Sequence, residues 1–173
     1  VNQKLAGLKT RDKAKTFIYA FLYGAGDAKI GSIVGQDSSV GKIIKERFLE
    51  NTPSLATLKQ QVGKASDKGY LKALDGRHVR VRSEHASLNF LLQSAGAIIA
   101  KRAWVIFHEL ATHLDYKQLG VIHDEIQIEC SPDDAEEIGK LTVKAMKLTT
   151  DYYKLRCPMT GEYKIGRSWN ETH

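Results

Sequence analysis

The stretch RDKAKTFIYAFLYGAG, residues 11–26, predicts an amphipathic helix followed by a stop. Its apolar residues recur with the i, i+3, i+4 spacing of one buried helical face: Ala14, Phe17, Ile18, Phe21 and Leu22. This spacing predicts a helix over residues 9–23. Gly24 and Gly26 follow directly, and glycine is the residue that most often ends a helix.

The same helix carries a second stripe at intervals of four residues: Arg11, Lys15, Tyr19 and Tyr23. Four residues advance slightly more than one helical turn, so these side chains lie along one flank of the buried face. Two cations followed by two aromatic rings suit a ligand that is both anionic and flat. The alternative is an ordinary amphipathic helix whose Lys and Tyr side chains lie at the boundary of its buried face.

Composition indicates one soluble globular domain. Of the 173 residues, 42% are hydrophobic and 27% are charged, which argues against a disordered or fibrous chain. No run approaches about 18 apolar residues and no stretch resembles a signal peptide, so we expect a cytoplasmic protein without a membrane partner. Cys130 and Cys157 form no C-x-x-C pair and are expected to be reduced.

The net charge of +6 is shared unevenly along the chain. Residues 1–102 hold 18 Lys and Arg against 8 Asp and Glu, whereas residues 103–173 hold 8 against 12. This asymmetry suggests a polyanion at the first part and a cation site at the second. A solvated basic surface explains the charge equally well, so charge alone leaves nucleic acid binding open.

Helices are expected to dominate the chain outside two short ribbons. Beyond the first helix they are predicted at residues 27–34, 40–50, from Pro53 with Thr52 as N-cap, 84–115, and from Ser131 to Tyr153. Residues 69–83 predict a hairpin with a basic face, because Asp75-Gly76 is a strong turn signal and valines alternate with arginines after it.

A second ribbon is predicted over LGVIHDEIQIEC, residues 119–130, and a short strand within the tail at residues 161–173. No repeat or linker interrupts these elements. We therefore expect an α+β fold, with one compact unit of helices around a small antiparallel sheet.

The turn His123-Asp124-Glu125 of the second ribbon places two adjacent carboxylates at the tip of a hairpin, where they contribute little to a core. Hard oxygen ligands suit Mg²⁺, and strands fix their geometry. The alternative is an ordinary polar turn. Together with the cations and rings of residues 11–23, the turn fits metal-assisted phosphoryl transfer on a nucleotide, with Arg11 and Lys15 neutralising a triphosphate.

A third stripe lies on the predicted long helix, where His85, Asn89 and Gln93 are again four residues apart. Amides and an imidazole along a helix can hydrogen-bond to duplex grooves or sugars without demanding one base sequence. The alternative is a set of ordinary exposed polar residues.

Three motifs, in order, resemble family A DNA polymerases. Arg11-x3-Lys15-x7-Tyr23-Gly24 is similar to their fingers-helix signature, HASLNFLLQSAGA (85–97) to their primer-template helix, and VIHDEIQI (121–128) to their metal-binding palm hairpin. The chain is most similar to the replicative polymerases of short-tailed bacteriophages, down to the terminal SWNETH. Single-subunit RNA polymerases share the Arg-Lys-Tyr-Gly helix, but their hairpin usually reads His-Asp-Ser, so Glu125 favours DNA synthesis.

The resemblance implies a role for each matched residue. Arg11 and Lys15 would bind the incoming dNTP, Tyr19 would lie beside its sugar and base, and Tyr23 would shape the templating pocket. Asp124 would be a catalytic Mg²⁺ ligand, and Glu125 beside it and Lys15 would also act in catalysis. DNA contacts would come from His123 at the primer end and from the stripe of the long helix, His85, Asn89 and Gln93.

The resemblance also implies an incomplete right-hand polymerase, with a fingers subdomain at residues 1–70 and a partial palm at 71–173. The second metal-binding aspartate of the family, in a motif resembling Asp-Tyr-Ser-x-x-Glu, is absent before Arg11. We therefore expect half of a two-metal site, inactive until an upstream segment or partner chain completes it. The alternative is a non-catalytic DNA-binding module or the remnant of a split polymerase. If the chain is phage-encoded, its place is the bacterial host cytoplasm.

Overall fold

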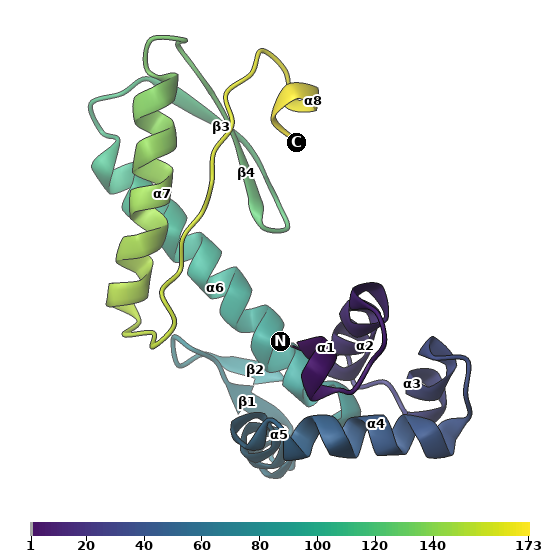
Figure 1. The fold of residues 1–173 in the computed structure, drawn as a ribbon. Helices are drawn as coiled ribbons and strands as arrows, with labels where there is room; N and C mark the ends of the chain where they lie inside the picture. Colours follow the sequence, from purple (N-terminus) through teal and green to yellow (C-terminus); the bar gives the residue numbers. More distant parts are fainter. Residues whose placement is uncertain (1) are drawn as a thin grey trace. The chain divides into compact units, whose positions relative to one another are not determined.

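The computed structural model describes residues 2–173, which form helices and two separate two-stranded antiparallel sheets (Figure 1). The α+β class is confirmed. The chain divides into two compact units, unit 1 at Val1–Ala95 and unit 2 at Gly96–His173. The expectation of one compact unit around a single sheet was therefore wrong, because each ribbon packs on helices of its own unit.

Unit 1 begins with five helices: α1 Asn2–Leu5, α2 Arg11–Leu22, α3 Asp27–Ile33, α4 Ser38–Glu50 and α5 Pro53–Ser66. The predictions for α2, α3 and α4 are confirmed to within about two residues at each end, and so is the predicted start of α5 at Pro53. Thr52 occupies the N-cap position of α5, but its hydroxyl does not cap that helix. It donates instead to the carbonyl of Phe48 in α4, at 2.5 Å.

The core of unit 1 is built on three phenylalanine rings from α2 and α4. Phe17 and Phe21 both meet Phe48 edge to face, with ring centroids 5.2 and 5.3 Å apart. All three side chains are buried, as the apolar spacing of α2 predicts. This packing fixes which side of α2 faces inward and leaves its polar flank at the surface.

The first ribbon pairs β1 Tyr70–Lys72 with β2 His78–Arg80, with Leu71 opposite Val79. Leu71 is buried together with Val62 of α5 and Leu88, which lies at the start of the long helix α6. Helix α6 spans Ser87–Leu110 and is preceded by the 3₁₀ turn η1 Glu84–Ala86. The predicted helix over 84–115 therefore ends five residues early, in a turn before the second ribbon.

Helix α6 bears on the expectation that no run of the chain is long and apolar enough to span a membrane. By length and composition it is apolar enough to be a candidate span among the described residues. Such a helix is weak evidence, because the core helix of a soluble protein passes the same test. Phe107 and Ala103 of α6 are buried in the protein, although only 17% of the candidate window is buried.

Unit 2 contains β3 Tyr116–Ile122, β4 Glu125–Cys130, α7 Ala135–Tyr152 and α8 Trp169–Thr172. Its core joins the end of α6 to α7 through Phe107, Ala111, Ile138 and Ala145. Tyr116 and Ile128 of the ribbon pack against this cluster. Helix α7 begins at Ala135 rather than at Ser131, because Ser131 to Asp134 form a turn closed by the Asp134 amide and the Ser131 carbonyl at 3.1 Å.

The tail of unit 2 forms no strand, contrary to the prediction. Residues 161–166 have no regular structure, and the tail runs beside α7 to the single turn α8 (Figure 1). Tyr163 attaches it to α7: its hydroxyl donates to Glu136 at 2.7 Å, and its ring covers Gly139 so closely that a methyl group there would clash. The tail therefore packs by side chains rather than by sheet pairing.

The end of α2 is fixed by a close backbone contact. Gly24 has a φ of +81°, which favours glycine, and its amide donates to the Phe21 carbonyl while that of Ala25 donates to Ala20. A Cβ atom at Gly24 would lie 2.1 Å from the carbonyl oxygen of His85. The end of α2 therefore meets the chain just before α6 at a distance that only glycine permits.

We predict that Gly24→Ala destabilises unit 1 more than Gly35→Ala, as measured by urea unfolding. Gly35 ends α3 with the same hydrogen-bond pattern and a φ of +76°, but an added Cβ would meet nothing within 4 Å. Gly35→Ala should cost about 1–2 kcal/mol from backbone strain alone. Equal losses for the two variants would show that the His85 contact does not constrain the fold.

Candidate functional site

The predicted stripe on α2 lies at the surface of unit 1. Thr10 caps the helix, accepting from the Lys13 amide at 3.3 Å. Arg11 and Lys15 are exposed and have no hydrogen-bond or ion-pair partner among the described residues. Tyr19 and Tyr23 are each 56% exposed, a large fraction for aromatic rings. Two unpaired cations and two open rings thus share one face, as the spacing predicts.

Unit 1 brings the α2 stripe together with the polar stripe of α6. The amide nitrogen of Gln93 donates to the Tyr23 hydroxyl at 3.2 Å. One turn earlier in α6, Asn89 is half-buried, and His85 lies in the 3₁₀ turn against Gly24. The two stripes, which the sequence suggests separately, therefore meet at the C-terminal end of α2.

A pocket that the sequence did not reveal lies next to the point where the end of α2 meets His85. It has a volume of about 580 Å³ and is lined in part by Phe21, Gly24, Lys59 and His85. Lys45 also lines it and pairs with Asp27 at 2.8 Å. Desolvation, and then the nearby charge of Lys45, lower the pKa of Lys59. Because these residues come from four separate elements, no local spacing could have identified them.

In unit 2 the turn between β3 and β4 consists of His123 and Asp124, with Ile122 paired to Glu125. His123 has a φ of +56°, a conformation typical of tight hairpin turns. Both turn residues are exposed, and Asp124 has no hydrogen-bond or ion-pair partner among the residues described. The carboxylate predicted to bind a metal is therefore open to solvent at the tip of the hairpin.

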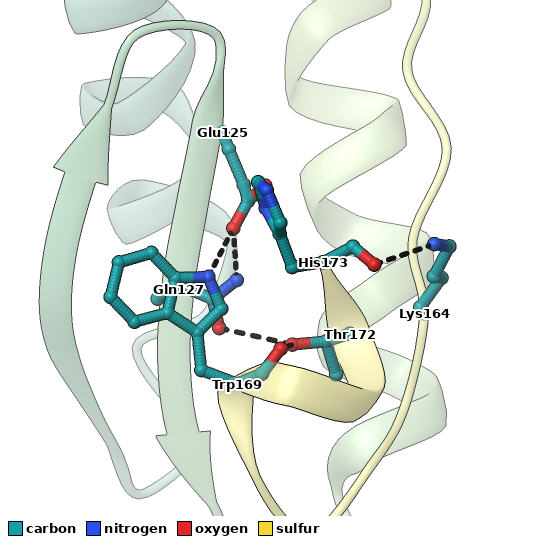
Figure 2. Close-up of polar contacts among 6 residues, drawn as sticks. All are labelled: Glu125, Gln127, Lys164, Trp169, Thr172 and His173. Atoms are coloured by element: carbon teal, nitrogen blue, oxygen red, sulfur yellow. Dashed lines mark hydrogen bonds and ion pairs between the residues drawn. The ribbon is translucent and has the colours of Figure 1, made fainter.

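Glu125, the next residue, is held on several sides (Figure 2). Its carboxylate accepts hydrogen bonds from the amide of Gln127 and from the indole of Trp169, the latter at 2.9 Å, and its other oxygen lies 2.9 Å from Nδ1 of His173. Hydrogen bonds from Gln127, His173 and Trp169 lower the pKa of Glu125. The two adjacent carboxylates thus lie in different environments.

The side chains of this turn could supply only some of the oxygen ligands that a hard divalent cation needs. Asp124 offers an exposed carboxylate, the kind of oxygen ligand that Mg²⁺ prefers. No group of three or more His, Cys, Asp and Glu side chains within residues 2–173 could hold a metal ion. The part of the chain that the structure describes therefore presents an open carboxylate at this turn and no complete metal site.

Comparison with known proteins identifies the family. A family model described as DNA polymerase family A matches residues 1–171. This chain belongs to DNA polymerase family A. The match covers all three motifs, so their order along the chain is that of a family member.

Two curated relatives are the DNA-directed DNA polymerases of Enterobacteria phage T3 and Escherichia phage T7, each 41% identical over 99% of this chain. The chain spans only 28% of the length of each. The DNA polymerase I of Aquifex aeolicus is 27% identical over 93% of the chain.

A solved structure shares the fold. The POL domain of Pol1 from M. smegmatis, in complex with DNA primer-template and dNTP, matches 86% of this chain with a TM-score of 0.75 at 19% identity. The match covers 30% of that protein. The chain thus shares the backbone arrangement of a part of that POL domain.

We predict that Glu125 makes the stability of unit 2 fall in acid. Because its pKa in the folded protein lies below the ordinary 4.5, its contribution is present above pH 4.5 and is lost as pH falls through the lowered value. Urea unfolding between pH 6 and 3 should show a smaller decline for Glu125→Gln. Parallel declines in the two proteins would mean that the Glu125 contacts add nothing to stability.

Proposed function

We propose that this chain supplies the nucleotide-binding helix and one metal-binding carboxylate to DNA-directed DNA synthesis, as fingers (residues 1–70) and part of the palm (71–173). The observation that carries the proposal is the combination of a family match over residues 1–171 with three motifs whose side chains are largely exposed. The reaction is transfer of a nucleotidyl group from a dNTP to a primer 3′ end. The phage relatives favour the cytoplasm of a bacterial host as its location.

The α2 stripe is suited to hold the dNTP. Arg11 and Lys15 are unpaired, so their charges are available to triphosphate oxygens, with Lys15 also stabilising charge as the phosphoryl group is transferred. Tyr19 offers a flat face for sugar and base. Tyr23 lies one turn further, and its hydrogen bond from Gln93 holds its hydroxyl beside the primer-template helix.

Asp124 is the residue of the turn best suited to bind Mg²⁺, because its carboxylate is open and its backbone is fixed by the ribbon. An ion held there by Asp124 would supply positive charge that stabilises the reacting phosphate groups. His123 lies on the same tip, where its ring can contact the primer end. By resemblance to the family, the second metal-binding aspartate comes from an upstream segment or a partner chain.

The start of α6 is suited to the primer-template. His85, Asn89 and Gln93 follow each other by one turn each, and Gln93 already contacts the α2 stripe. Amide and imidazole groups can bond to sugars and groove edges of any sequence. Such contacts would position the duplex next to the nucleotide without selecting its sequence.

We predict that Asp124→Ala abolishes primer extension in a chimera where this chain replaces the matching segment of the phage T7 polymerase. The rate should fall by more than about 100-fold, because mutating even a residue that only hydrogen-bonds to a metal ligand typically lowers activity or metal affinity by about 10- to 100-fold. Extension of a labelled primer measures it.

Asp115→Ala is the matched control. Asp115 is an exposed aspartate in the turn before β3 that the family motifs do not include, so its loss should leave the rate unchanged. A chimera with Asp124→Ala that kept its full rate would refute the assigned role of Asp124.

A second candidate function is DNA binding without chemistry, favoured by the basic β1–β2 ribbon. His78, Arg80 and Arg82 are all exposed there. Residues 1–102 also carry 10 more positive than negative charges. Such a module would bind duplexes by their phosphates, independently of sequence and with strong salt dependence.

For this second function we predict that the logarithm of DNA affinity falls linearly with the logarithm of salt concentration, measured by anisotropy of a labelled primer-template. Replacing Arg80 and Arg82 by Gln should reduce the slope by about 2, one for each lost phosphate contact. Replacing Lys144 and Lys147 of α7, also exposed, removes the same charge from unit 2 and should leave the slope unchanged.

Equal changes for the two double variants would refute binding through the ribbon. Binding that appeared only with a matching dNTP would argue against a non-catalytic module and support the polymerase.

A further inference from the structure

The end of the chain is tied to the hairpin tip by side chains. Trp169 and His173, four residues apart on the last turn, reach the two different oxygens of Glu125, each at 2.9 Å (Figure 2). Thr172, between them, donates to Gln127 at 3.3 Å, and Gln127 in turn donates to Glu125. Three residues of one turn thus converge on two residues of β4.

The tail that carries this turn is itself anchored within unit 2. Tyr163 donates a hydrogen bond to Glu136 of α7, and its ring packs closely against Gly139. Lys164 donates to the backbone oxygen of His173 at 3.3 Å. The contacts with Glu125 are therefore not those of a loosely hanging segment, since α7 and the tail determine where the last turn lies.

The two carboxylates of the hairpin are treated differently by this arrangement. Glu125 has both oxygens engaged, and its side chain is 29% exposed. Asp124 is exposed and makes no hydrogen bond with any described residue. A carboxylate that already accepts three hydrogen bonds must lose some of them before it can enter the shell of a metal ion, whereas a solvated one loses only water.

We propose that Trp169 and His173 form a clamp that reserves Glu125 as a positioning residue and leaves Asp124 as the metal-binding carboxylate of the turn. This inference rests on the proposed function and assigns the division of labour within it. Because the clamp holds Glu125, the first residue of β4, it also fixes the position of the backbone of Asp124, the residue before it in the turn. Glu125 would then act on the metal only through the backbone of Asp124.

The clamp is tested by the indole N–H signals of the whole chain in ¹⁵N-correlated NMR spectra. Trp104 and Trp169 are the two tryptophans, and Trp169→Phe assigns their signals. The Trp169 signal should shift upfield in Glu125→Gln, which weakens its acceptor, and in His173→Ala, which loosens the last turn. It should stay unchanged in Asp124→Asn. If the Trp169 signal did not move in Glu125→Gln while the other signals remained those of a folded protein, the clamp would be overturned.

The division of labour is tested by adding Mn²⁺, a paramagnetic substitute for Mg²⁺, to the same samples. Broadening of the amide signals at residues 122–126 should disappear in Asp124→Asn and persist in Glu125→Gln. Broadening lost in Glu125→Gln and kept in Asp124→Asn, or absent from the unsubstituted chain, would overturn it. Neither readout requires DNA synthesis, so failure of the proposed function and failure of the clamp are distinguishable.

Discussion

The close approach of Gly24 to the carbonyl of His85 is the contact on which the arrangement of unit 1 depends. It holds the end of α2 against the chain that leads into α6. The hydrogen bond from Gln93 to the neighbouring Tyr23 adds a second contact between the end of α2 and α6 itself. The phenylalanine core sets the rotation of α2 about its axis. Together these contacts bring the cationic and aromatic stripe of α2 beside the polar stripe of α6.

The hairpin of unit 2 illustrates how neighbouring residues of the same chemistry come to lie in different environments. Asp124 and Glu125 are adjacent, but the first lies in the turn and the second begins β4. Only Glu125 is therefore within reach of Trp169 and His173. Its lowered pKa and its bonds are those of a structural anchor, whereas the open carboxylate beside it is free to bind a cation.

Local patterns predicted most of the fold, because helix spacing, glycine stops and hairpin turns depend on neighbours in sequence. The α2 stripe and the Asp124 turn were found in this way. The contacts that depend on distant residues were missed, such as Trp169 with Glu125, 44 positions away, and the lysines of the unit 1 pocket. The predictions of a strand in the tail and of a start of α7 at Ser131 were wrong. The local pattern of residues does not reveal which surface of the protein covers these two segments.

The most direct test of the central claim, that the α2 stripe binds the nucleotide, is photo-crosslinking of the chain with an azido-dATP followed by peptide mapping. The account predicts that the label falls within residues 11–23, is displaced by unmodified dATP, and is lost when Arg11 and Lys15 are both replaced by Ala. A label in unit 2, or labelling of α2 that survives both replacements, would contradict it.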